Sequence, residues 1–331
     1  MDSKGKRESR ERGDLNNVAS MPPSANAETS MLRVAVRNAI KSDARVVLAV
    51  SGGRDSMVLL DAASRWRASA IVSVATFDHG TGVAARNAVD LVREAARALG
   101  VPFARGRGRG LAPTEATWRA ARWAFLRETA DALSARVATA HTRDDQLETV
   151  FIRALRGAGA RGLAGLYAET DIVRPLLDVS RHTVAEYAQA RALPVADDPS
   201  NRSLRYLRNR VRLELLPALE AARPGFGESL LAIARRAAAW RGEVERRVDR
   251  MHPTWDGKSL FVTGDAFAPY DERALSILWP ALAARAGITL DRRGTERLTQ
   301  FGRHKRAPGR VDIAGGHVVV RHRHAYEVRP A

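Results

Sequence analysis

The sequence predicts an α/β fold, a doubly wound parallel sheet, followed by a smaller, mainly helical C-terminal domain. Two observations carry this prediction. Between residues 31 and 155, apolar runs of strand length alternate with amphipathic stretches of helical length, which is the pattern of parallel βαβ units. Residues 228–251 then form one long amphipathic stretch rich in Ala and Arg, after which the regular alternation stops.

The elements of the first part follow from hydrophobic spacing and from stop signals such as Gly100. They are expected in this order: helix Met31–Lys41, strand Val46–Val50, helix Ser56–Trp66, strand Ile71–Phe77, helix Val83–Leu99, helix Thr114–Leu133, strand Ala135–Ala140 and helix Asp144–Leu155. Because the carboxyl ends of parallel strands share one edge, the polar clusters that follow these strands are expected to meet there.

The second part is predicted to contain helices and three short strands. The helices are expected near Val184–Ala192, Val211–Leu219, Glu228–Met251, Glu272–Ala286 and Arg292–Gln300, and the strands near Arg310–Ile313, Val318–Arg321 and Tyr326–Val328. We therefore divide the chain into a polar N-terminal extension (residues 1–30), for which we expect disorder, an α/β domain (31–217) and a C-terminal domain (218–331).

Composition narrows the class of protein. The net charge is +17, from 54 Lys and Arg against 37 Asp and Glu, which favours a polyanionic partner, nucleic acid first. An Arg-rich proteome would give the same excess, so charge alone decides nothing. The chain has no Cys, which excludes disulfides, thiolate zinc sites and Cys-ligated iron–sulfur clusters. No apolar run reaches the roughly 18 residues of a membrane span, and no signal peptide begins the chain, so we expect a cytoplasmic protein without a membrane partner.

The strongest motif is Ser51-Gly-Gly-Arg-Asp-Ser56, directly after the strand Val46–Val50. Adjacent glycines allow backbone N–H groups to approach an anion closely, and the following helix N-terminus favours a phosphate. The Gly-Lys-Ser/Thr ending of a P-loop is absent, as is the Gly-x-Gly-x-x-Gly fingerprint. A plain strand-to-helix turn with an Asp or Ser cap is the alternative.

A second cluster follows the strand Ala135–Ala140. His141 precedes a predicted helix. On this helix Asp145 and Glu148 lie one turn apart on one face, and so do Asp144 and Glu148. Carboxylates so placed suit a magnesium ion or an ammonium group, and the imidazole suits phosphate contact or proton transfer. Helix-dipole charges with a solvated His would also explain part of this pattern.

Two arginine groups complete the set. Arg119 and Arg122 lie on one helical stripe with Glu115, an arrangement that an ordinary surface ion pair also explains. Further along, several arginines are concentrated in a segment around Tyr206. This composition favours a segment that contacts phosphates and stacks on bases over an ordinary charged surface helix. The expected nucleic-acid contacts are Arg205, Arg208, Asn209, Arg210 and Arg212.

In combination these pieces resemble the tRNA(Ile)-lysidine synthase family of the PP-loop ATP pyrophosphatases, with an adenine nucleotide α-hydrolase-like fold. The resemblance covers about residues 45–217. The matching motifs are Ser51–Ser56, Asp78-His-Gly80, Glu115 with Arg119 and Arg122, His141 with Asp144-Asp-Gln146 and Glu148-Thr149, Arg156-Gly-Ala-Gly159, Arg174-Pro-Leu-Leu177, Asp198-Pro-Ser-Asn201 and Arg208-Asn-Arg210.

The resemblance implies a ligase that adenylates C2 of the wobble cytidine in the CAU anticodon of tRNA(Ile) with ATP, then joins free L-lysine there to form lysidine, releasing AMP and pyrophosphate. It implies that Ser51, Gly52, Gly53, Arg54, Asp55 and Ser56 hold ATP, with Asp55 also on Mg²⁺. His141 would act at the α-phosphate and Arg119 or Arg122 would neutralise its charge. Asp145 and Glu148 would receive the lysine ammonium or assist its deprotonation.

Several alternatives stay open at this point. A 2-thiocytidine synthetase needs Cys pairs that this chain lacks, and the arginine segment speaks against a PP-loop synthetase or amidotransferase for small molecules. A non-catalytic RNA-binding module would not need Asp55, His141, Asp145 and Glu148 together.

The chain departs from the family pattern in two places. The family usually has Leu-Arg after the Asp-His-Gly motif, where this chain has Thr81-Gly82. The C-terminal domain, expected to bind tRNA, is shorter than in the longer members, and a homodimer is one of the open states of assembly.

Overall fold

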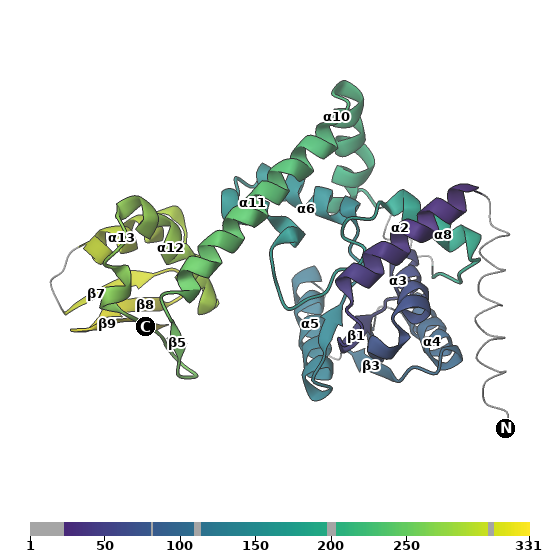
Figure 1. Ribbon diagram of the computed structural model, residues 1–331, viewed down its shortest axis with the longest axis horizontal. Helices are drawn as coiled ribbons and strands as arrows, with labels where there is room; N and C mark the ends of the chain where they lie inside the picture. The colour runs from purple at the N-terminus through teal and green to yellow at the C-terminus, as the bar shows by residue number, and fades with distance from the viewer. Residues whose placement is uncertain (1–22, 81, 109–113, 197–202, 304–307) are drawn as a thin grey trace. The chain divides into compact units, whose positions relative to one another are not determined.

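A computed structural model describes residues 23–80, 82–108, 114–196, 203–303 and 308–331. The chain forms two compact units (Figure 1). The first holds the described residues up to Ala158 together with Gly165–Ala234, and the second holds Gly159–Ala164 together with Arg235–Ala331. The predicted boundary at Pro217 lies at the start of a helix inside the first unit.

The first unit is built on a four-stranded sheet in the order β3-β2-β1-β4. The strands are β1 (Val46–Ala49), β2 (Ile71–Asp78), β3 (Phe103–Arg107) and β4 (Arg136–Ala138). Every neighbouring pair is parallel, which confirms the predicted parallel sheet. β3 was not predicted, because its sequence Phe-Ala-Arg-Gly-Arg lacks the apolar run of a buried strand, and it lies at the sheet edge.

Helices join and cover these strands. They are α2 (Pro23–Ala39), α3 (Arg54–Trp66), α4 (Val83–Ala98), α5 (Glu115–Ala132), α6 (Arg143–Leu155), α8 (Arg181–Ala190), α9 (Leu207–Arg210), α10 (Leu216–Ala222) and the start of α11 (Phe226–Asp249). The helix predicted from Met31 begins at Pro23, and Pro is well suited to a first helical position because it has no N–H to leave unpaired. A π-helical turn, Val211–Leu215, joins α9 to α10.

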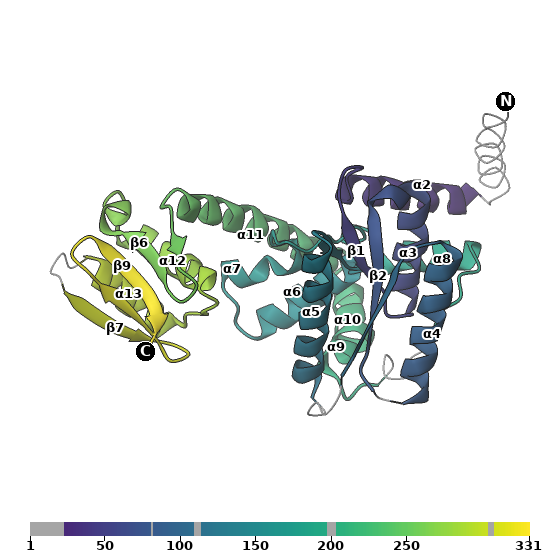
Figure 2. The ribbon, with the colours of Figure 1, turned by 90° about the horizontal axis from the view of Figure 1, so that it is seen from below.

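Both faces of the sheet are covered, as a doubly wound fold requires. Val47 packs with Leu126 and Ala130 of α5 on one face. Its neighbours Val46 and Leu48 point to the other face, into a larger core with α2, α3, α4 and α8 (Figure 2). This alternation follows from the two-residue period of a strand.

The second unit combines helices with an antiparallel sheet. Its helices are α7 (Ala160–Leu163), the end of α11, α12 (Glu272–Arg285) and α13 (Arg292–Arg303). Its sheet has the order β5-β6-β9-β8-β7, with β5 (Thr254–Trp255), β6 (Leu260–Thr263), β7 (Gly309–Ile313), β8 (His317–Arg321) and β9 (Ala325–Pro330). The three predicted strands are confirmed, whereas β5 and β6 were missed although the Asp256-Gly257 pair between them signals a hairpin. Trp279 stacks on Phe267 and contacts Tyr326 at the centre of the core.

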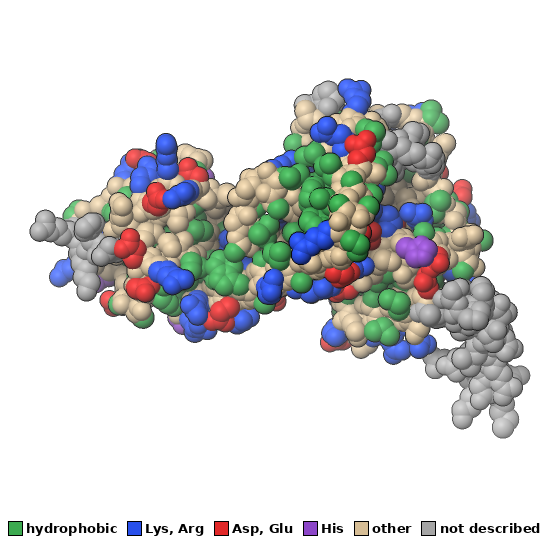
Figure 3. Space-filling model, turned by 90° about the horizontal axis from the view of Figure 1, so that it is seen from above, with side chains coloured by type: hydrophobic (Ala, Val, Ile, Leu, Met, Phe, Trp, Pro, Cys, Tyr) green, Lys and Arg blue, Asp and Glu red, His purple; other side chains and the backbone are tan. Residues whose placement is uncertain are grey.

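The described surface carries charges of both signs. On the face drawn in Figure 3, Lys and Arg side chains are spread over the chain and interspersed with Asp and Glu. None of the helices within the described ranges is both long enough and apolar enough to cross a membrane.

Candidate active site

The Ser51–Ser56 loop connects β1 to α3 at the carboxyl edge of the sheet. Gly52 has φ +85°, which favours glycine, and a Cβ there would make a tight contact of 3.1 Å with Cβ of Ala88. The Ser56 hydroxyl donates to the Gly53 carbonyl at 2.8 Å and accepts from the Ser51 N–H at 3.1 Å. α3 begins at Arg54, and no side chain caps it from its N-cap residue Gly53. The loop therefore presents a helix N-terminus suited to an anion.

Asp55 lies in the first turn of α3, and its carboxylate is partly buried. Oδ1 is enclosed and accepts no hydrogen bond, although Nε of Arg54 lies 3.7 Å from it, while Oδ2 lies 4.0 Å from Nε of Arg181. Burial raises the pKa of Asp55 above its ordinary value, against the opposing charge of Arg181. A buried carboxylate oxygen without a donor is an acceptor available to a ligand or a cation.

His141 follows β4 at the same edge of the sheet. Its Nδ1 lies 2.8 Å from the Thr139 hydroxyl. Burial lowers the pKa of His141 to about 4, and the charges of Arg174, Arg208 and Arg119 act in the same direction against Asp145. The imidazole is therefore neutral at pH 7, where it can donate or accept a hydrogen bond but brings no charge.

This shift predicts a pH effect on stability. Because the unfolded chain binds a proton at about pH 6.5 and the folded chain only near pH 4, acid favours the unfolded state between these values. We expect wild type to lose stability relative to His141→Asn as the pH falls from 6.5 to 4, by at most about 1.4 kcal/mol per pH unit. Chemical denaturation of both proteins across this window measures the difference. Parallel stability curves would show that His141 titrates normally.

Asp145 and Glu148 project from the first two turns of α6. Thr142 caps this helix through a capping box, in which the Asp145 carboxylate accepts from the Thr142 backbone N–H at 2.8 Å. Although burial acts to raise the pKa of Asp145, that hydrogen bond and the charges of Arg181 and Arg208 hold it below its ordinary value. Glu148 is fully buried, with 1% of its side chain exposed. The two carboxylates share one face, as predicted.

Three guanidinium groups surround this pair. Arg181 contacts Asp145 at 3.1 Å and Glu148 at 3.0 Å. Arg208 contacts the same two carboxylates at 2.9 Å and 2.7 Å. Arg212 lies 2.7 Å from Glu148 and 3.8 Å from Asp145. Because Arg181 also approaches Asp55, one network joins the Ser51–Ser56 loop to the acidic cluster.

Sequence comparison gives the family of the chain. The PP-loop domain family matches residues 23–219. A tRNA(Ile)-lysidine synthase of a Bradyrhizobium species is 34% identical over 285 residues, 81% of this chain and 79% of that protein. The chain belongs to the tRNA(Ile)-lysidine synthase family. The synthase of Solibacter usitatus is 36% identical over 292 residues, and that of Bradyrhizobium diazoefficiens 39% over 223 residues. The alignments cover 65% and 61% of these two relatives, respectively.

A solved structure shows the same fold. The U34-tRNA thiolase from Methanococcus maripaludis superposes with a TM-score of 0.54 at 16% identity, over 65% of this chain and 79% of that one. This likeness concerns the fold alone, and the PP-loop assignment rests on the family match to residues 23–219.

Arg181 is the site residue that the sequence did not reveal. It occupies the first position of α8 after the N-cap Ser180, where a cation opposes the helix dipole. Its backbone N–H donates to Asp144 at 2.7 Å, and its side chain turns back to the acidic cluster. A basic residue at a helix N-terminus was the available local signal, and it is weak because α3, α6 and α13 also begin with Arg.

The remaining predicted residues of a lysidine synthase lie in three environments. Arg119 is close enough to depress the pKa of His141, and Arg122 acts likewise on His79, although burial is the larger cause in both cases. Arg205 and Arg210 are exposed, whereas Asn209 is buried and donates to the Ser203 carbonyl. Segment 198–201 lies outside the described residues.

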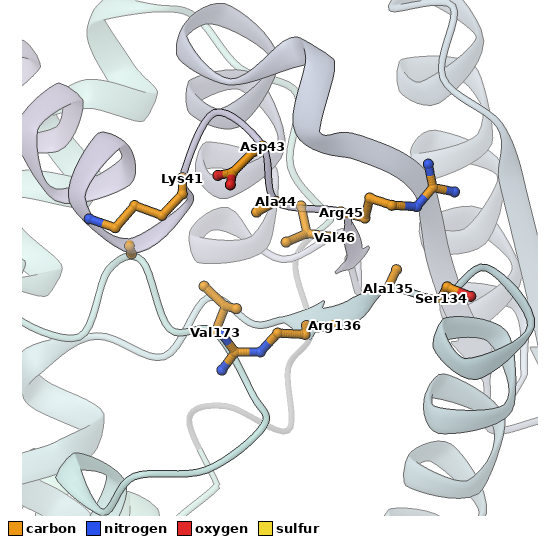
Figure 4. A pocket seen from close by; sticks show the side chains of 10 residues that line it. Lys41, Asp43, Ala44, Arg45, Val46, Ser134, Ala135, Arg136 and Val173 are labelled. Atoms are coloured by element: carbon orange, nitrogen blue, oxygen red, sulfur yellow. The ribbon is translucent and has the colours of Figure 1, made fainter.

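A separate hollow lies at the opposite edge of the sheet (Figure 4). It is lined by Arg45, Val46 and Arg136, at the amino ends of β1 and β4. Both guanidinium groups already donate to backbone carbonyls, Arg45 to Leu133 and Arg136 to Asp171. We assign this hollow no part in catalysis.

Proposed function

We propose that the chain ligates L-lysine to C2 of the wobble cytidine in the CAU anticodon of tRNA(Ile), using ATP and Mg²⁺. One observation carries the proposal: Arg181 contacts Asp145 and Glu148 and lies 4.0 Å from Asp55, which brings the loop and the acidic cluster together and supports a common site. A nucleotide bound at the loop and an amine bound at the acidic cluster would lie close enough to react in turn with the same RNA base.

Asp55 is the residue that would hold Mg²⁺. Its enclosed Oδ1 lacks a donor, and a carboxylate oxygen is the ligand that Mg²⁺ prefers. The described residues contain no group of three Asp, Glu, His or Cys side chains that could form a metal site by themselves. This fits an ion bound through one carboxylate and the nucleotide phosphates, where it would neutralise phosphate charge.

In the first step, the C2 carbonyl oxygen of cytidine attacks the α-phosphorus, and the bond to the leaving pyrophosphate breaks with its electron pair. The N–H groups at the start of α3 bind phosphate oxygens. Neutral His141 can donate a hydrogen bond to the α-phosphate. Arg119 or Arg122 would stabilise the increased negative charge of this phosphate.

In the second step, the lysine side-chain amine attacks C2, and the C2–O bond to AMP breaks. With a reference pKa of about 10.4, this amine is protonated at neutral pH and must lose a proton before attack. Asp145, held in its ionised form, receives the ammonium group, and Glu148 lies beside it. The proton passes from nitrogen to this carboxylate pair or to water.

Omission experiments test the proposal. The full chain is incubated with total tRNA, Mg-ATP and radiolabelled lysine, and label in RNA is measured. We expect that incorporation of lysine requires both ATP and RNA. A tRNA(Ile) with the CAU anticodon should suffice as the only RNA in the reaction. A small-molecule PP-loop synthetase would instead consume ATP without RNA and leave the RNA unlabelled.

We further propose that Arg205 and Arg210, both exposed beside the site, contact the RNA backbone. Arg205→Gln with Arg210→Gln should weaken tRNA binding and reduce the slope of log affinity against log salt by about 0.7 to 0.9 per lost contact. Filter binding at several salt concentrations measures this slope. Arg93→Gln, which removes an exposed arginine paired with Asp90, is the matched control. An unchanged slope in the double variant would remove both arginines from the interface.

A further inference from the structure

The carboxylate of Glu148 has its hydrogen-bonding capacity filled by arginines. Oε1 accepts from Nη1 of Arg181 at 3.0 Å and from Nε of Arg212 at 2.7 Å. Oε2 accepts from Nε of Arg208 at 2.7 Å and from Nη2 of Arg212 at 3.2 Å. A carboxylate offers about four acceptor positions, and all four are in use here.

The carboxylate of Asp145 is filled in the same way. Oδ1 accepts from Nη2 of Arg181 at 3.1 Å and from Nη2 of Arg208 at 2.9 Å. Oδ2 accepts from the backbone N–H and the hydroxyl of Thr142 at 2.8 Å and 3.0 Å. The two carboxylates proposed to receive the substrate amine therefore have no acceptor position left for it.

Of the three guanidinium groups, Arg208 is the one whose departure opens the site. It alone combines close contacts to both carboxylates with substantial exposure, since 41% of its side chain is accessible against 25% for Arg212 and 18% for Arg181. Its removal would free one position on Asp145 Oδ1 and one on Glu148 Oε2, so that an ammonium group could bridge them.

The charge balance of the cluster agrees with the departure of one arginine. The four carboxylates of the network carry four negative charges, which four guanidinium groups balance: the carboxylates are Asp55, Asp144, Asp145 and Glu148, and the arginines are Arg54, Arg181, Arg208 and Arg212. Without Arg208 the cluster would have one uncompensated negative charge in a largely buried place. A substrate ammonium supplies that one positive charge, whereas an ammonium added to the complete cluster would face like-charge repulsion.

We propose that Arg208 is a built-in occupant of the amine subsite, displaced when an RNA phosphate binds its guanidinium. The proposal rests on the function proposed above and names the regulation of that site. Arg208 belongs to α9, a short helix followed by the π-helical turn Val211–Leu215, and exposed Arg205 and Arg210 flank it in sequence. Irregular helix of this kind is frequent at functional sites. Phosphate oxygens compete well for guanidinium, so RNA binding would open the amine subsite.

Calorimetric titration of the RNA-free full chain with L-lysine tests this inference, with 1,5-diaminopentane as an amine that has no carboxylate. Arg208→Gln should bind both amines about tenfold or more tightly than wild type, because one charge and two acceptor positions become available. Arg246→Gln, which removes an arginine paired with Glu243 in the second unit, should bind like wild type. Equal or weaker amine binding by a folded Arg208→Gln protein would overturn the inference.

Two further results separate this inference from the proposed function. If wild type labels tRNA with lysine but Arg208→Gln binds amines no more tightly, only the inference fails. If no tRNA is labelled but Arg208→Gln still binds 1,5-diaminopentane more tightly than wild type, the proposed ligase function is wrong. The inference that Arg208 occupies the amine subsite is then still supported. If Arg208→Gln does not fold, lysine binding to wild type is measured with and without tRNA instead. Added tRNA should raise the affinity for lysine, and an unchanged affinity would overturn the inference.

Discussion

Asp55→Asn is expected to lower lysine incorporation into tRNA by at least about 10²- to 10³-fold, the usual cost of removing one group aligned with developing charge. The substitution keeps the shape of the side chain and removes the charge that would bind Mg²⁺. Because burial raises the pKa of Asp55, its ionised form is unfavourable in the folded protein. The variant should therefore melt at a temperature at least as high as wild type.

The combination of lost activity with retained stability distinguishes a functional carboxylate from a structural one. Initial rates of incorporation and thermal melting, measured on the same preparations, give both quantities. Asp61→Asn is a suitable comparison, because Asp61 lies on the same helix but accepts a hydrogen bond from Tyr187 at 2.5 Å. That variant should lose stability and keep a measurable rate. Wild-type activity in Asp55→Asn would contradict the assignment.

Glu148→Gln is expected to have the largest effect on stability, together with loss of lysine transfer. The buried carboxylate contacts three guanidinium groups, and removal of one member of a buried ion pair costs about 3–5 kcal/mol. We expect the lower end of this range, because Arg208 keeps access to water. Chemical denaturation gives the free energy of unfolding, and incorporation assays give the rate.

Glu243→Gln provides a matched control. Glu243 also contacts three arginines, Arg246, Arg247 and Arg250, but it lies on the exposed face of α11. Exposed ion pairs contribute little, so this variant should unfold like wild type. Equal effects of the two substitutions would show that burial of the Glu148 network does not contribute to stability.

The sequence was informative about the fold where local chemistry determines structure. β1 and β2 are apolar runs, and Thr142 with Asp145 forms a capping box, so these elements were predictable. β3 was not, because an edge strand needs no continuous apolar face, and its arginines pair with Asp78 of the neighbouring β2. β5 and β6 were missed because strands of two and four residues carry little periodicity.

For the site, the sequence supplied the candidate groups but not their pairing. Gly52, Asp55 and His141 follow strand ends, so their common location was expected from the parallel topology. Arg208 and Arg212 were predicted as RNA contacts from composition, and their role in RNA binding remains a prediction. Their contacts with Asp145 and Glu148 join parts of the chain some 60 residues apart, and no local pattern encodes such pairs.

The most direct test of the account follows the α-phosphate of ATP. Wild type is incubated with tRNA, Mg²⁺ and ATP labelled at the α-phosphate, first without lysine and then with it. If the loop and the acidic cluster form one site, label should appear on the RNA before lysine is added and should leave as AMP afterwards. RNA that acquires no label, or label that lysine does not release, would contradict the account.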